Sequence, residues 1–126
     1  MGVSALLAMA YAIACLGVIG FQAALIAGAP WGRLTQGGGR EGPLSPAGRA
    51  FAGVSAGLNA AMALAVLSAA GLWPGWPAWT GWAALGLQAV VVVLNLITRS
   101  APERRLWAPI TAAMLALAAG VVVPAG

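Results

Sequence analysis

Histidine, aspartate and lysine are absent from this chain of 126 residues, and its acids are Glu41 and Glu103 alone. A Ser-His-Asp triad cannot be built without His and Asp. Clustered His, Cys and Asp ligands for a metal are also missing, so we expect no metal and no cofactor. The single cysteine, Cys15, can form no intramolecular disulfide and has no His to activate it. An enzyme that uses Glu41 or Glu103 is the catalytic alternative that remains.

Charge of either sign is scarce. Only 6% of the residues are charged and 62% are hydrophobic, with a mean hydropathy of +0.95. Soluble domains carry about 25% charged residues, so this chain cannot cover a surface that faces water. Six arginines on short loops are too few for a nucleic-acid interface. The composition therefore predicts a membrane protein whose main partner is the lipid bilayer.

Four apolar runs predict four transmembrane helices, over residues 3–28, 50–72, 80–97 and 107–123. A helix needs about 20 residues to cross the hydrocarbon core. Ala27-Gly28-Ala29 resembles a signal-peptide cleavage site, but the first run is too long for such a peptide and has no basic segment before it. We expect a single all-α domain over residues 1–126, a four-helix membrane bundle.

All charges fall in the first and third loops, which must lie on one side of the membrane. The positive-inside bias makes that side cytoplasmic and places both termini outside. The bias to Ala, Gly, Pro and Arg is typical of GC-rich bacterial genomes, so we expect a bacterial inner membrane. Tryptophans near the helix ends are typical of an interfacial belt. The three-residue spacing of the outer four also allows an aromatic binding lip: Trp73, Trp76, Trp79 and Trp82.

Small residues recur every four positions in the second and fourth runs. Such stripes let helices approach closely in lipid, and Gly53-x-x-x-Gly57 has the GxxxG form. The stripes predict packing either within the bundle or along a seam with another chain, as a homo-oligomer or with a partner subunit. Their members are Gly53, Gly57, Ala61, Ala65 and Ala69 in one run, and Ala108, Ala112, Ala116 and Gly120 in the other.

Polar side chains inside the runs are the candidate site residues. Gln22, Asn59 and Asn95 fall in the cytoplasmic half, and Gln88 lies nearer the middle. Asn59 and Asn95 could join the second and third helices by hydrogen bonds. Alternatively, Gln22, Asn59 and Asn95 line a polar pocket that opens toward the loops and is gated by arginines: Arg33, Arg40 and Arg104. No ionisable group lies inside a span, which argues against a proton-coupled transporter.

The loops offer three further patterns. Glu103 stands beside Arg104 and Arg105, which predicts an ion pair within the third loop. Residues 37–39 are three glycines, either a flexible loop or a nest of N–H groups that binds an anion. Residues 29–34 and 101–106 both read A-P-x-x-R-L, a sign of two parallel-repeat hairpins.

The loop sequences around Gly28–Gly32 and Arg99–Pro109 resemble those of small uncharacterised four-helix membrane proteins of GC-rich bacteria. This resemblance implies the architecture and no activity. Two hypotheses remain for the function. One is a non-enzymatic accessory subunit or homo-oligomer that docks through the small-residue stripes. The other is a binder or transporter of a small neutral or anionic amphiphile or lipid.

Overall fold

A computed structural model describes residues 2–126. Its long elements are all α-helices. The four α-helices are α1 (Val3–Ile26), α2 (Pro46–Ala69), α3 (Ala78–Ile97) and α4 (Ala101–Ala125). Two short 3-10 helices, η1 (Gly32–Leu34) and η2 (Gln36–Gly38), lie in the first loop. All four α-helices are long and apolar enough to cross a membrane. The predicted all-α, multi-pass membrane fold is confirmed.

The second and fourth helices begin earlier than predicted, and for the same reason. Ser45 and Ser100 each cap a helix by accepting a hydrogen bond from the backbone N–H three residues later, and each is followed by a proline in the first turn. A serine cap and an early proline are both favoured at helix starts. The fourth helix, Ala101–Ala125, is therefore longer than the span predicted over residues 107–123 and contains it. Most of the supposed third loop, including Arg104, lies in the first turns of α4.

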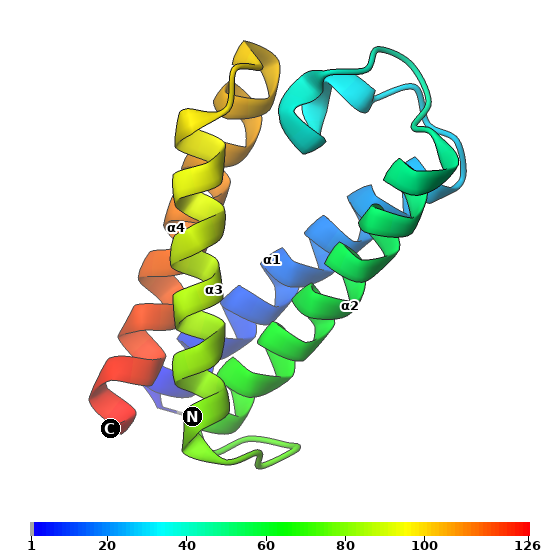
Figure 1. The fold of residues 1–126 in the computed structure, drawn as a ribbon. Coiled ribbons are helices and arrows are strands. Elements are labelled where there is room, and N and C mark those ends of the chain that lie inside the picture. The colour runs from blue at the N-terminus through cyan, green and yellow to red at the C-terminus, as the bar shows by residue number, and fades with distance from the viewer. Residues whose placement is uncertain (1) are drawn as a thin grey trace.

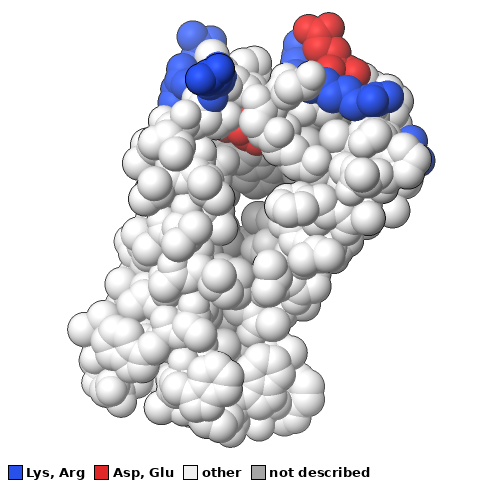
Figure 2. All heavy atoms as spheres, viewed as in Figure 1, with Lys and Arg blue, Asp and Glu red and all other residues white. Residues whose placement is uncertain are grey.

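The helices form two hairpins that spread apart toward one end, α1 with α2 and α3 with α4 (Figure 1). Both termini and the short α2–α3 turn lie at the closed end of this arrangement, and the two arginine-bearing connections lie at the open end. Figure 2 shows the charged side chains gathered at the open end on the face in view. The two connections thus share one end of the molecule, as the sequence predicts.

The main core lies toward the closed end, where the hairpins meet. Its fully buried members include Tyr11, Cys15, Val66 and Ala118. The Tyr11 hydroxyl donates to Gln88 Oε1 at 2.8 Å, and Gln88 Nε2 donates to the carbonyl of Thr111 at 3.1 Å. These two bonds connect α1, α3 and α4 near the middle of the bundle. The hairpins pack together from this level to the end with the termini, and they diverge toward the end with the arginines.

The small-residue stripes do not pack within the chain along their whole length. Gly53, Gly57 and Ala61 are exposed on α2, whereas Ala65 is buried. Residues four apart are offset by about 40° around a helix. A stripe with five members therefore rotates around the helix, from the exposed side into the core. Ala112 and Ala116 on α4 are exposed too, and Ala108 is buried; Gly120 is exposed but approaches Leu7 on α1. Intramolecular packing therefore does not account for most of the stripe.

The two A-P-x-x-R-L segments adopt different conformations. Residues 29–34 form a bend and η1, whereas residues 101–106 form the first turns of α4. The predicted duplication thus gains no support from these segments and stays a prediction.

Candidate functional site: a pocket between the hairpins

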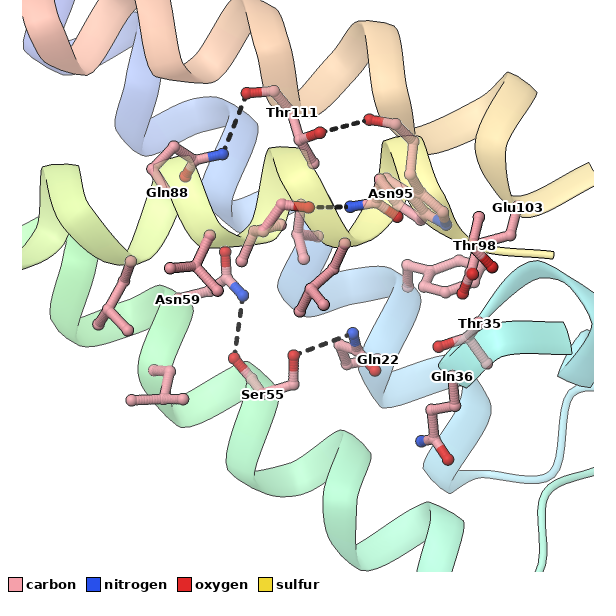
Figure 3. Close-up of a pocket in the computed structure, with 18 of the residues that line it drawn as sticks. Gln22, Thr35, Gln36, Ser55, Asn59, Gln88, Asn95, Thr98, Glu103 and Thr111 are labelled. Atoms are coloured by element: carbon pink, nitrogen blue, oxygen red, sulfur yellow. Dashed lines mark hydrogen bonds between the residues drawn. The ribbon is translucent and has the colours of Figure 1, made fainter. Parts of the chain in front are cut away.

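A pocket of about 630 Å³ fills the space between the diverging hairpins. All four helices and the first loop contribute to its wall, and it lies in the half of the molecule that carries the charges (Figure 3). Known ligand pockets have volumes of about 300–1,000 Å³ and mostly apolar linings with a few polar groups. The lining here is of this kind.

The mouth of the pocket faces sideways, between α2 and α3. On both helices, apolar side chains that line the pocket are also exposed at the surface; they are Phe51, Val54 and Leu58 on α2, and Leu87, Val90, Leu94 and Ile97 on α3. Figure 2 shows the hollow between the two hairpins on this face. Because these helices span the membrane, the mouth opens toward lipid.

The first loop closes the end of the pocket nearest the charges. Three hydrogen bonds attach it to the start of α4: Ser100 Oγ donates to the carbonyl of Arg33 at 2.7 Å, Trp107 Nε1 donates to the carbonyl of Leu34 at 2.9 Å, and the N–H of Gly37 donates to Glu103 Oε2 at 3.2 Å. Thr35, Gln36 and Gly37 line the pocket from this loop. The predicted opening toward the arginine loops is instead an end wall.

Aromatic rings reinforce that end. Phe21 stacks on Trp31, with ring centroids 5.8 Å apart. It also makes a T-shaped contact with Trp107, with ring centroids 4.8 Å apart. Phe21 and Trp107 line the pocket. Aromatic pairs of this geometry contribute about 0.5–1.5 kcal/mol beyond their buried area. Trp107, which the sequence suggested as part of an interfacial belt, thus also joins the loop to α1 and α4.

Gln22 is the polar residue of the wall whose bonding is incomplete. Its side chain is 9% exposed, its Nε2 donates to Ser55 Oγ at 3.2 Å, and its Oε1 has no hydrogen-bond partner. A buried acceptor without a partner costs about 1–3 kcal/mol. This oxygen is covered in the structure, and a turn of the Gln22 side chain toward the pocket would let it accept from a ligand that carries a hydrogen-bond donor.

Asn59 and Asn95 line the same pocket from opposite hairpins but do not bond to each other. Asn59 Nδ2 donates to the carbonyl of Ser55 at 2.9 Å, and Asn95 Nδ2 donates to that of Val91 at 2.9 Å. The prediction that they join the second and third helices was wrong. Asparagine readily bonds to its own helix four residues back, and the hairpins have separated at this level. The side-chain oxygens are left for other partners (Figure 3).

The three arginines predicted as a gate, Arg33, Arg40 and Arg104, do not line the pocket. Arg33 is exposed, Arg40 Nε donates to the carbonyl of Pro43, and Arg104 Nη1 donates to that of Thr98. The structure brings Gln22, Asn59 and Asn95 to one pocket and leaves the arginines outside it.

Glu103 was expected to pair with a neighbouring arginine, and it does not. Glu103 as a whole is 6% exposed and lines the pocket, and its carboxylate accepts a hydrogen bond from the N–H of Gly37. The glycine segment was considered as a nest that binds an anion. In the described residues, the anionic group that its Gly37 N–H contacts is the carboxylate of Glu103. The sequence predicted an ion pair within the third loop instead, because Gly37 and Glu103 lie 66 positions apart and their contact forms only in the folded chain.

A second, smaller pocket of about 140 Å³ lies at the closed end, lined in part by Trp76 and Trp82. Trp73 and Trp79 are 78% and 69% exposed, so the four outer tryptophans do not gather around it. The large pocket is the better candidate site. No His, Cys, Asp and Glu cluster that could hold a metal is found among residues 2–126.

Comparison with protein-family models, curated proteins and solved structures finds no match for this chain.

Proposed function

We propose that this membrane protein binds an amphiphile, with the polar head between the hairpins and the hydrocarbon chain leaving through the mouth between α2 and α3. The observation that carries the proposal is a pocket of about 630 Å³ whose polar groups lie inside and whose rim is apolar and exposed. An amphiphile that diffuses in the bilayer can enter such a site without crossing water.

Two features of the wall support this function. The orphaned Gln22 Oε1 and the pocket-lining amides of Asn59 and Asn95 offer hydrogen bonds to a head group. The rim side chains of α2 and α3 offer contact to a tail. Either binding alone or transfer across the membrane would use such a site.

The test uses photolabelling with dodecanol that carries a diazirine at its tail, on the chain reconstituted in phosphatidylcholine nanodiscs. Leu94→Trp places bulk in the mouth, whereas Leu96→Trp places it on a lipid-facing position of the same helix outside the pocket. Leu94 and Leu96 are 57% and 56% exposed, so the two changes are matched. We expect Leu94→Trp to lower labelling of pocket residues about tenfold, equivalent to about 1.4 kcal/mol. Equal labelling in both variants would contradict the proposal.

The second candidate is an accessory subunit or homo-oligomer that docks through α2. The outward position of Gly53, Gly57 and Ala61 favours it, since a surface of small residues lets another helix approach closely. The two candidates are compatible, because the stripe and the mouth involve different residues of α2.

We also propose that the membrane is a bacterial inner membrane with the arginine end in the cytoplasm, as the positive-inside bias suggests. Kinship with small uncharacterised four-helix membrane proteins of GC-rich bacteria remains part of the same proposal, supported by the loop sequences.

A further inference from the structure

The pocket carries a single charged side chain among the described residues that line it, and that side chain is negative. Glu103 projects from the first turn of α4 and is 6% exposed. The other polar side chains of the lining are amides, hydroxyls and the indole of Trp107. The arginines lie at the same end of the molecule, but none belongs to the wall.

The contacts of Glu103 leave most hydrogen-bond acceptor positions of its carboxylate unused. Gly37 donates one hydrogen bond to Oε2, at 3.2 Å, and the start of α4 provides a favourable helix dipole. A carboxylate has about four acceptor positions. Its nearest arginine along the chain, Arg104, directs Nη1 to the carbonyl of Thr98 instead. The negative charge thus lacks a cationic partner within the described residues.

Groups on the same wall suit a cation as well. Trp107 lies four residues after Glu103, on the same face of α4, and packs against Phe21. Aromatic faces attract cations within about 6 Å. The buried, unpaired oxygen of Gln22 becomes a further acceptor from α1 when that side chain turns toward the pocket. The wall therefore combines hydrogen-bond acceptors, aromatic rings and one negative charge that has no arginine partner within the described residues.

We infer that the pocket selects an amphiphile whose head is a protonated amine, with Glu103 as its counter-ion and Gln22 as a second acceptor. This inference rests on the proposed amphiphile site and specifies its ligand class. It replaces the neutral or anionic ligand expected from the arginine-rich loops, because those arginines do not reach the wall.

The experiment uses the full chain in phosphatidylcholine nanodiscs and three tail-diazirine probes of equal length: dodecylamine, dodecanol and dodecanoate. Labelling is quantified by intact mass and located by peptide mass spectrometry. Glu103→Gln removes the charge while its amide oxygen can still accept from Gly37. Glu41→Gln is the matched control, since Glu41 is exposed and does not line the pocket.

We expect Glu103→Gln to raise the half-saturating concentration of the amine about tenfold, as for loss of a charge pair worth about 1.4 kcal/mol. Dodecanol should lose far less affinity than the amine, because its hydroxyl can donate to the amide oxygen of the variant as it does to a carboxylate, and saturable dodecanol labelling also shows that the variant is folded. Glu41→Gln should alter neither probe, and dodecanoate should bind Glu103→Gln better than the original chain.

The outcomes separate the two proposals. If dodecanol labels the pocket and Glu103→Gln shifts the amine and the alcohol equally, the amine selectivity is wrong and the amphiphile site stands. If none of the three probes labels pocket residues in a saturable way, the amphiphile site itself is wrong, and the inference fails with it.

Discussion

At the scale of single residues, Gly38 permits the loop to reach α4. Its φ is +67°, in the left-handed region, and a Cβ placed there would overlap the side chain of Ser100. The bond from Ser100 Oγ to the carbonyl of Arg33 lies beside it. A glycine is thus required both by the backbone conformation and by the close approach of the two segments.

Gly38→Ala should therefore destabilise the loop that covers the pocket by about 2 kcal/mol or more, since a left-handed alanine costs about 1–2 kcal/mol before any overlap is counted. Gly39→Ala is the control: Gly39 has φ −72° and no neighbour within 4 Å of an added Cβ. The free energy of unfolding, measured by SDS titration in mixed micelles, should change by less than about 0.5 kcal/mol in the control. Equal losses in both variants would show that the loop does not depend on Gly38.

At the scale of elements, α2 has one face that can contact a ligand and another that can contact a second helix. One face carries the rim of the pocket, with Val54 and Leu58, and another carries Gly53 and Gly57. An added Cβ at Gly57 meets nothing within 4 Å, so a larger residue there leaves the chain's own packing intact. This makes α2 suitable for separating assembly from ligand binding.

Gly57→Leu should reduce the oligomer size of the protein if α2 is a docking surface, because tight helix approach is lost. Gly86→Leu on α3 is the control, since Gly86 is also exposed with open space around it. Light scattering of the purified protein in detergent gives the mass of each assembly. An oligomer that survives Gly57→Leu unchanged would remove α2 as the seam, and a monomeric original chain would remove the homo-oligomer altogether.

At the scale of the whole molecule, the hairpins are joined firmly at one end and kept apart at the other. The core and the Tyr11–Gln88 bond hold the end that carries the termini. At the other end, the loop over the pocket keeps the hairpins connected through its bonds to α4. The arginines lie at this second end of the molecule, where an anionic membrane surface would attract each of them by about 1 kcal/mol.

This arrangement gives a prediction for orientation in cells. Gly39→Cys should react with a membrane-impermeant maleimide only after the cytoplasm is opened, whereas Ala78→Cys at the α2–α3 turn should react in intact cells stripped of their outer membrane. Both positions are exposed, and the native Cys15 is fully buried, so the original chain is the unlabelled control. Reaction of Gly39→Cys in intact cells would reverse the proposed topology.

Much of the architecture could be predicted from the sequence, because lipid imposes strong conditions on it. An apolar run of about 20 residues must be helical to satisfy its backbone, and this condition located four helices to within a few residues at most ends. The errors fell at Ser45 and Ser100, where capping extends a helix into polar sequence. The Ser100-x-x-Glu103 spacing was a readable signal of that start.

The sequence by itself determined the class of protein, the four spans and the gathering of the arginines at one end, since these depend on composition and on the order of apolar runs. It also identified Gln22, Asn59 and Asn95 as polar groups in one layer. Only the tertiary structure decided that the hairpins diverge, that Glu103 joins the pocket wall and that the arginines stay outside it. Those features depend on contacts between residues some 70 positions apart, and a helical pattern that repeats every 3.6 residues carries no record of such contacts.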